Sequence, residues 1–175
     1  MKIINITVLF VLLIFSTISI FAEDVIIDIE NYKTEEVKGI VFKWQIIENS
    51  LYINISAPTS GWVAVGFDPS RMMKDANILI GYVKDGKTYM EDHFGAGKIK
   101  HKADIDLGGS DDITIISGSE EEDKTTLEFS IPLNSWDSND RRLEEGKEYK
   151  VIFAFGKKDD FTSYHKLRTS LMITL

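Results

Sequence analysis

The stretch GWVAVGF at residues 61–67 decides the fold, because it is apolar on both of the faces that a β-strand would present. Successive side chains of a strand point to opposite sides of its sheet. A run of this kind therefore predicts a strand in the middle of a sheet, with both sides covered. The runs NILIGYV at 77–83 and YKVIFAFG at 149–156 have the same character and predict two further central strands.

Working outward from this stretch, other segments alternate apolar and polar side chains, which predicts strands with one buried and one exposed face. They lie at 42–46, 51–56 and 126–131, and shorter strand candidates lie at 25–29, 113–117 and 171–175. No long segment after residue 22 has the 3.6-residue period of a helix. We therefore predict an all-β protein, an antiparallel, immunoglobulin-like β-sandwich of about nine to eleven strands.

Two turns in this pattern carry specific signals. The pair Asp85-Gly86 lies between two apolar runs and is the strongest hairpin signal in the chain. The acidic run from Glu120 to Asp123 predicts a hairpin tip that faces solvent, since blocks of like charge are rarely buried.

The first 22 residues have the order of an export signal. Lys2 supplies a positive start, residues 3–20 are almost wholly apolar, and the small Ala22 stands before an acidic pair. We expect a signal peptide at 1–22, a single domain at 23–175, and export to the periplasm or the cell exterior. An uncleaved anchor is the alternative, because the apolar run approaches the roughly 20 residues of a spanning helix. Only in that case would the protein contact a membrane.

The composition excludes several classes of function. The formal net charge of −8 argues against binding to nucleic acid or to anionic lipid. The chain contains no cysteine, which excludes disulfides, thiol catalysis, iron–sulfur clusters and covalent c-type haem. It also lacks the phosphate-binding loop, the H-E-x-x-H zinc motif and the G-x-S-x-G nucleophile motif. With no nucleophile–base pairing visible, we expect a protein that is not an enzyme.

Two acidic loops approach a calcium-binding pattern without matching it. DIDLGGSDD, which starts at Asp104, has Gly108 where a third oxygen ligand should stand. DSNDRRLEEGKE, which starts at Asp137, has two arginines where an EF-hand needs an oxygen ligand and a glycine. Neither loop is an EF-hand. An irregular calcium site remains open, because oxygen-rich loops bind this ion without that pattern.

Met72, Met73 and His165 allow two interpretations. Taken singly, one methionine fills a gap in the core and the other is exposed, and the histidine lies in a surface loop. Taken together, a thioether and an imidazole on opposite walls of an apolar pocket form a ligand pair for haem iron. Without cysteine, such a haem would be held non-covalently. The candidates for an apolar lining are Trp62, Phe67, Ile78, Ile80, Tyr82, Phe153, Phe155 and Tyr164.

Several segments, in this order, are similar to those of one known family. They are SGWVAVGF at 60–67, MKDANILIGYV at 73–83, YMEDHF at 89–94, FSIPLNSWD at 129–137, and LEEGKEYKVIFAFG at 143–156, with the pair Tyr164-His165 after them. From about 40 to 170 the chain resembles a DOMON domain, and within that family the b-type cytochrome domain of cellobiose dehydrogenase. The haem-binding members use one methionine and one histidine as axial ligands. By position the resemblance implies Met73 and His165, with Met72 as the alternative to Met73.

The resemblance implies an exported, haem b-binding, cytochrome-like protein that transfers electrons to or from a separate redox partner protein or a small-molecule donor. Met73 and His165 would hold the iron, and the other cofactor-binding residues would be Trp62, Phe67, Ile80, Tyr82, Phe155 and Tyr164. The haem propionates would pair with Arg71, Lys74, Lys166 or Arg168. One alternative is a non-haem DOMON module that binds a sugar or another small ligand, with Trp136 as a stacking ring. The other is an interaction domain without a ligand.

Overall fold

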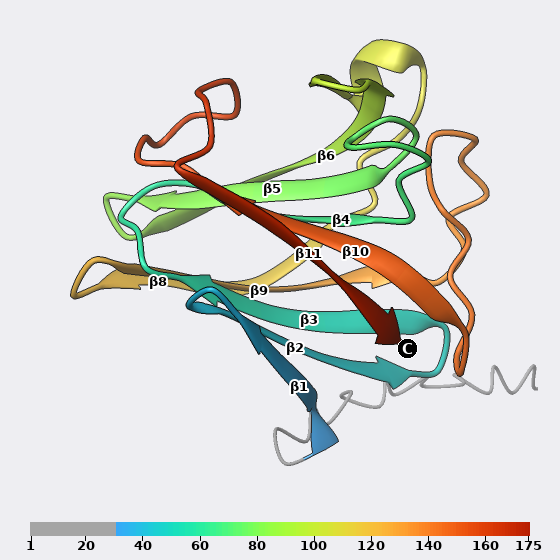
Figure 1. Ribbon diagram of the computed structural model, residues 1–175, viewed down its shortest axis with the longest axis horizontal. Coiled ribbons are helices and arrows are strands. Elements are labelled where there is room, and N and C mark those ends of the chain that lie inside the picture. The colour runs from blue at the N-terminus through green and yellow to red at the C-terminus, as the bar shows by residue number, and fades with distance from the viewer. Residues whose placement is uncertain (1–30) are drawn as a thin grey trace, which may run out of the picture.

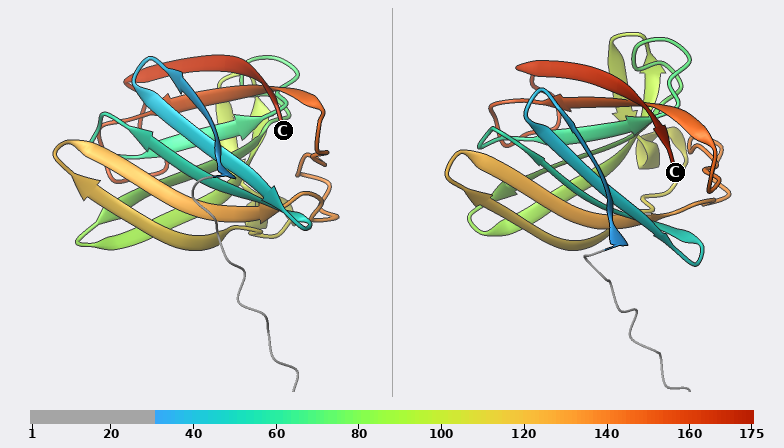
Figure 2. Two further views of the ribbon diagram at one scale, coloured as in Figure 1. Left: turned by 90° about the horizontal axis from the view of Figure 1, so that it is seen from below. Right: turned by 60° about the horizontal axis from the view of Figure 1, so that its bottom comes forward.

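The computed structural model describes residues 31–175, which form two antiparallel β-sheets packed face to face (Figure 1 and Figure 2). The strand order is β1-β2-β3-β9-β8 in the five-stranded sheet and β11-β10-β4-β5-β6-β7 in the six-stranded sheet. This arrangement confirms the predicted all-β sandwich. The expected signal peptide and the strand candidate at 25–29 lie outside the described residues.

The five-stranded sheet consists of β1 (Lys33–Val37), β2 (Ile40–Ile47), β3 (Ser50–Ala57), β9 (Lys124–Pro132) and β8 (Thr114–Glu121). The six-stranded sheet consists of β11 (Leu167–Thr174), β10 (Glu148–Phe155), β4 (Val63–Phe67), β5 (Asn77–Lys84), β6 (Lys87–Gly97) and β7 (Lys100–Ala103). A short 3-10 helix, η2 (Asp104–Leu107), follows β7. Within residues 31–175, no helix is long and apolar enough to cross a bilayer.

The main hydrophobic core lies between the two sheets. Phe42 and Phe129 of one sheet and Phe67 and Phe153 of the other are at most 1% exposed there. The rings of Phe42 and Phe153 have their centroids 5.2 Å apart, so the two sheets interlock through aromatic contacts. Removal of such rings from water supplies much of the free energy that favours folding.

The three runs that are apolar on both faces form β10, β4 and β5, which are neighbours in the middle of the six-stranded sheet. In β4 the side chains of Val63, Val65 and Phe67 belong to the core between the sheets. The alternate residue Ala64 belongs to a second apolar cluster on the outer face, together with the partly buried Met73 and Phe161 from two loops. The prediction of central strands is confirmed, and loops provide the cover on the outer side.

Both predicted hairpin signals are confirmed. Asp85 (φ 52°) and Gly86 (φ 72°) connect β5 to β6, and two positive φ values in succession are what a type I′ turn requires. Glu122 (φ 50°) and Asp123 (φ 58°) connect β8 to β9 in the same way, at the exposed acidic tip.

Candidate functional site

The outer face of the six-stranded sheet carries a cavity of about 1370 Å³. This volume exceeds the roughly 300–1,000 Å³ of most small-molecule pockets, so the cavity can hold a large cofactor. Its floor is built from alternate residues of the central strands, whose side chains point away from the core between the sheets. These residues are Trp62 just before β4, Ala64 and Gly66 in β4, Ile78, Ile80 and Tyr82 in β5, and Ile152 and Ala154 in β10.

The floor is hollow because small residues occupy the middle of the sheet. Ala64 of β4 pairs with Ala154 of β10, and Gly66 pairs with Ile152. A Cβ on Gly66 would come within 2.9 Å of the Cγ1 of Ile152 and 3.1 Å of the Cγ1 of Ile78. Glycine at position 66 therefore allows the side chains of Ile152 and Ile78 to approach each other over the strand. The alanines leave open space above the sheet.

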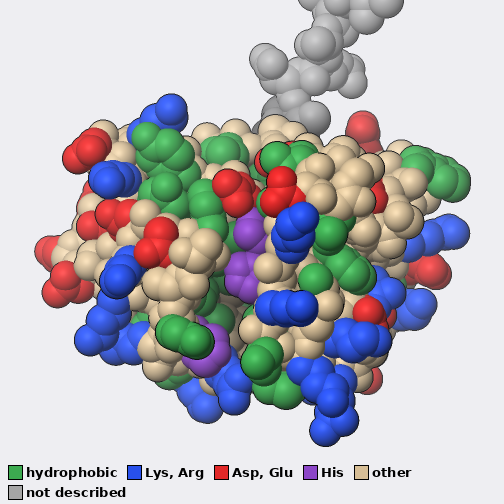
Figure 3. All heavy atoms as spheres, turned by 90° about the horizontal axis from the view of Figure 1, so that it is seen from above, with side chains coloured by type: hydrophobic (Ala, Val, Ile, Leu, Met, Phe, Trp, Pro, Cys, Tyr) green, Lys and Arg blue, Asp and Glu red, His purple; other side chains and the backbone are tan. Residues whose placement is uncertain are grey.

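Segments far apart in the sequence build the walls of this cavity. Figure 3 shows histidine side chains in a hollow on this face, with lysine and arginine side chains around it. All three histidines of the chain line the cavity. The wall residues used below are His93 and His101 from β6 and β7, Met72 and Met73 from the loop at 68–76, and Phe161, Tyr164 and His165 from the loop at 156–166.

The methionine loop at 68–76 is a compact turn that is fixed against the end of β6. The N–H of Ala76 donates a hydrogen bond to the carbonyl oxygen of Met73 (3.1 Å), and the N–H of Gly95 donates to the carbonyl oxygen of Ala76 (2.8 Å). A Cβ on Gly95 would overlap the carbonyl oxygen of Met73. The absence of a side chain at Gly95 therefore allows the close approach that places Met73 in the cavity wall.

The histidine loop at 156–166 is tied to the start of β4. The indole Nε1–H of Trp62 donates a hydrogen bond to the Oγ of Ser163 at 2.9 Å. The carboxylate of Asp160 accepts hydrogen bonds from the backbone N–H groups two and three residues later, and these bonds lower its pKa. The loop is therefore ordered by local contacts, and it presents His165 at the cavity rim with its side chain exposed.

His93 of β6 and His101 of β7 contact each other in the cavity wall, and the ring centroid of His93 lies 6.2 Å from that of Phe161. Their Nδ1 atoms are 2.6 Å apart, and the Nε2 of His93 lies 2.8 Å from Oε2 of Glu91. When both imidazole rings are neutral, the Nε2–H of His93 donates a hydrogen bond to Glu91 and the Nδ1–H of His101 donates one to the Nδ1 of His93. The Nε2 of His101 is then left as an acceptor. Burial, followed by the charge of His93, lowers the pKa of His101 to about 4.

Six of the eight predicted cofactor-binding residues line this cavity: Met73, His165, Trp62, Ile80, Tyr82 and Tyr164. Tyr164 lies at the rim and is 96% exposed. The other two, Phe67 and Phe155, do not line it, because they are 0% and 2% exposed in the core between the sheets. Inward-facing positions of β4 and β10 hold them on the wrong side of the sheet for a ligand in the cavity.

The lining of the cavity includes basic side chains, with acidic ones, Glu91, Asp106, Asp159 and Asp160, among them. Lys98, Lys100 and Lys102 from the β6–β7 hairpin line it, as does Arg168 of β11. Four basic residues were expected from the sequence to pair with the haem propionates. Arg168 is part of the cavity lining, whereas Arg71, Lys74 and Lys166 are not. Sequence reasoning missed the hairpin lysines and the His93–His101 pair, whose only signal was the small number of histidines in the chain.

Comparison with known proteins identifies relatives of this chain. The family model of the DOMON domain matches residues 36–156. The chain is 29% identical over 120 residues to DBH-like monooxygenase protein 1 of Mus musculus, a match that covers 67% of this chain and 19% of that protein. It is 32% identical over 116 residues to MOXD1 homolog 2 of Drosophila melanogaster, which covers 66% of this chain and 15% of that protein. The chain thus spans about a fifth or less of the length of these relatives.

Solved structures with the same fold include two cytochrome domains. The cytochrome b domain of pyranose dehydrogenase from Coprinopsis cinerea has a TM-score of 0.61 at 11% identity, over 77% of this chain and 75% of that one. The cytochrome domain of cellobiose dehydrogenase from Myriococcum thermophilum has a TM-score of 0.62 at 10% identity, over 82% and 81% of the two chains. At these identities the likeness concerns the fold alone.

Proposed function

Because the chain belongs to the DOMON domain family, we propose that its outer cavity binds haem b non-covalently and that the protein is a cytochrome-like electron carrier. Met73 and His165 are the proposed axial ligands. The observation that carries the proposal is that these two residues, from loops far apart in the sequence, line one large cavity with an apolar floor.

The residues of the cavity fit this cofactor. Its floor of aliphatic and aromatic side chains suits the faces of a porphyrin ring, and its volume of about 1370 Å³ is ample for one. The rings of Tyr82 and Phe161 have their centroids 4.9 Å apart and offer an aromatic surface beside the ligand. The basic side chains of the lining, Arg168 and the lysines of the β6–β7 hairpin, suit the two propionate carboxylates.

The chemistry of the two ligands favours electron transfer. A haem iron with protein ligands on both sides has no open position for oxygen or substrate, so it changes only its oxidation state. Met73 and His165 would hold the iron through neutral donors, and the thioether would favour its ferrous state. We therefore assign no catalytic step to this chain, and its electron donor or acceptor is a separate protein or a small molecule.

We also propose that the protein acts outside the cytoplasm, in the periplasm or at the cell exterior. The support is the signal-like order of the first 22 residues. This chain matches 19% of the length of DBH-like monooxygenase protein 1 of Mus musculus, and the proposed function includes no monooxygenase activity.

Titration of the haem-free protein with haem tests the proposal. We expect one equivalent to bind and to give the visible spectrum of a six-coordinate, low-spin haem, with a sharp α band on reduction. Met73→Leu and His165→Ala should each abolish that spectrum. Met172→Leu is the matched control, because Met172 is 57% exposed and lies outside the cavity lining. Failure of the wild-type protein to take up haem would overturn the proposal.

Two further variants separate Met73 and His165 from their neighbours. Met72 and His101 also line the cavity, and the Nε2 of His101 is free to act as an acceptor. We expect Met72→Leu and His101→Asn to keep the low-spin spectrum. If Met72→Leu loses the low-spin spectrum and Met73→Leu keeps it, Met72 is the ligand. If His101→Asn loses the spectrum and His165→Ala keeps it, His101 is the ligand.

A sugar or another small molecule is the second candidate for the same cavity. The observation that favours it is that Asp159, Asp160 and Phe161 all line the wall, since carboxylates and aromatic rings together suit a sugar. Trp136 is 89% exposed and lies outside the cavity lining, so it is not part of such a site. Calorimetry with glycans tests this candidate; a heat lost in Phe161→Ala but kept in Met73→Leu would support it.

A further inference from the structure

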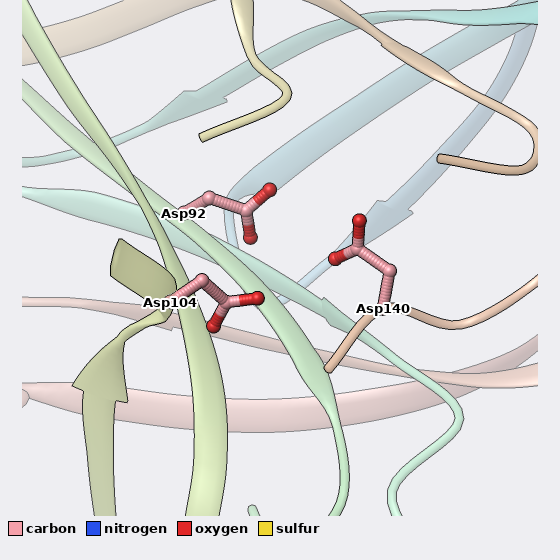
Figure 4. Close-up of side chains that lie close together, drawn as sticks. All are labelled: Asp92, Asp104 and Asp140. Atoms are coloured by element: carbon pink, nitrogen blue, oxygen red, sulfur yellow. The ribbon is translucent and has the colours of Figure 1, made fainter. Parts of the chain in front are cut away.

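Three aspartates converge at one place in the fold that the cavity does not include. Asp92 lies in β6, Asp104 is the first residue of η2, and Asp140 lies in the connection between β9 and β10. Each offers one carboxylate oxygen, and these three oxygens lie within 4.8 Å of one another. Figure 4 shows the three side chains approaching one another from separate segments. None of the three lines the cavity described above.

Two of these carboxylates are buried with no oxygen in a well-formed hydrogen bond, and only the backbone N–H of Asp112, near Asp92, acts against the rise in the pKa of that carboxyl. Asp92 is 3% exposed and Asp104 is 0% exposed. No ion pair among residues 31–175 includes Asp92, Asp104 or Asp140. Native proteins pair nearly all buried polar groups, and an unpaired buried carboxylate is among the most unfavourable of them. The cluster therefore lacks a positively charged partner.

The electrostatics of the cluster agree with this geometry. Burial, followed by the charges of Asp140 and Asp104, raises the pKa of Asp92 to about 9. Burial, followed by the charge of Asp140, raises the pKa of Asp104 to about 7. Burial also raises the pKa of Asp140. Every charge that raises these values is another carboxylate, so a single cation at the centre would relieve all three groups.

A non-acidic side chain points to a ligand in the same place. Asn77, the first residue of β5, is 4% exposed, and its Nδ2 donates a hydrogen bond to Oδ1 of Asp140 at 2.7 Å. Its carboxamide oxygen is buried without a hydrogen-bond partner. An amide oxygen left unpaired beside a carboxylate cluster is an additional neutral ligand of the type that hard cations accept.

We propose that Asp92, Asp104 and Asp140 bind a divalent cation of the Ca²⁺ type, with Asn77 as a neighbouring oxygen donor. Ca²⁺ takes six to eight oxygen ligands at about 2.4 Å, so two oxygens on one ion are at most about 4.8 Å apart. The three carboxylate oxygens meet this limit. Mg²⁺ binds oxygens at about 2.1 Å and keeps several waters, which suits a fully buried group such as Asp104 less well.

The proposed site explains why the two acidic loops that start at Asp104 and Asp137 match no standard calcium pattern. Asp104 comes from the first loop and Asp140 from the second, and each loop supplies a single ligand to a centre that β6 completes. A bound cation would connect β6, η2 and the β9–β10 connection. It would thereby brace the β6–β7 hairpin, which also supplies His93 and His101 to the cavity wall. The binding itself is independent of haem.

Thermal unfolding and calorimetry of the full chain, freed of metal with EDTA, test the proposal. We expect Ca²⁺ to bind with a stoichiometry of one and to raise Tm by roughly 5–10 °C at a hundred times its Kd. Mg²⁺ should give a smaller shift at the same concentration. Absence of both a Ca²⁺ heat and a Tm shift in the wild-type protein would overturn the proposal, and a shift with Mg²⁺ as large as that with Ca²⁺ would overturn the Ca²⁺ assignment.

Matched variants keep the test decisive. Asp104→Asn and Asp140→Asn should each weaken Ca²⁺ binding at least tenfold and remove the Tm shift. Asp106→Asn is the control: this residue lies in the same short helix, is exposed, and approaches Lys102 at 3.8 Å. It should keep the full shift. Without metal, Asp104→Asn should melt no lower than the wild type, because it removes one unpaired buried charge. A Ca²⁺ shift retained in both ligand variants would contradict the site.

Discussion

The two faces of the six-stranded sheet have similar apolar character but different cover. On the inner face, Val63, Val65 and Phe67 of β4 pack against the second sheet in a closed core. On the outer face, Ala64 and Gly66 of the same strand lie under a cavity whose walls come from two loops and from the β6–β7 hairpin. The comparison teaches that a strand buried on both sides need not lie between two packed layers. One apolar face serves stability, and the other is available for a ligand.

The largest expected effect is a difference in the free energy of unfolding that is lost when a side chain is truncated on the inner face or on the outer face. Phe67→Ala should lower the free energy of unfolding by about 3–5 kcal/mol, because it opens a cavity in the closed core. Ile152→Ala should cost only about 1–2 kcal/mol in the haem-free protein, because this partly buried side chain already borders open space. Denaturant unfolding of both variants measures the difference. Equal costs would mean that the outer face is packed as tightly as the inner one.

A smaller effect concerns the position of the methionine loop. Gly95→Ala should weaken haem affinity at least tenfold, about 1.4 kcal/mol, because its methyl group displaces the carbonyl of Met73. Gly97→Ala is the matched control, since a Cβ there meets only side-chain atoms of Lys100, at 3.3 Å or more. Haem titration measures both variants. If Gly95→Ala binds haem as well as Gly97→Ala does, the close approach of Gly95 and Met73 is not needed for the site.

The smallest expected effect is a pH dependence that arises at the cavity wall. Burial and the charge of His93 lower the pKa of His101 to about 4, while the nearby Glu91 acts in the opposite direction. Between about pH 6.5 and 4 the unfolded chain binds a proton at this residue and the folded chain does not, so the histidine lowers stability as the pH falls. The slope should be a fraction of the roughly 1.4 kcal/mol per pH unit that one proton allows, since the ring is only partly buried.

The comparison of wild-type and His101→Asn protein isolates this contribution, because the acidic groups are the same in both. We expect the variant to gain stability relative to the wild type as the pH is lowered from 6.5 to 4. Denaturant unfolding at several pH values measures that difference. A difference that does not change with pH would show that His101 titrates normally in the folded protein.

The alternation of residues predicted most of the fold, and the missed strands show its limit. Strands β2, β3 and β9 each place one apolar face on the core, so their pattern is visible in the sequence. In contrast, β1 has the sequence KTEEV and β7 has KHKA, with no buried residue in either. Both lie at sheet edges, where backbone hydrogen bonds to one neighbour suffice. Such strands leave no hydrophobic signal.

The site was less accessible to sequence reasoning, for two physical reasons. Trp62 and Phe67 are an odd number of positions apart along a continuous extended segment, so they face opposite sides of the sheet and cannot both line one pocket. The sequence alone shows that Trp62 and Phe67 lie on opposite faces of the sheet. It does not show which of the two faces carries the cavity. The aspartate cluster draws one residue from each of three segments, and linear spacing cannot reveal a site of that kind.

The most direct test of the haem site is the proton NMR spectrum of the ferrous, haem-loaded protein. A methionine bound to iron has its methyl group directly over the porphyrin ring, whose ring current displaces the methyl resonance far upfield. We predict one such resonance, present in the wild type and absent in Met73→Leu. A haem-loaded spectrum in which no methionine methyl is displaced would contradict ligation by Met73, and with it the proposed methionine–histidine cytochrome site.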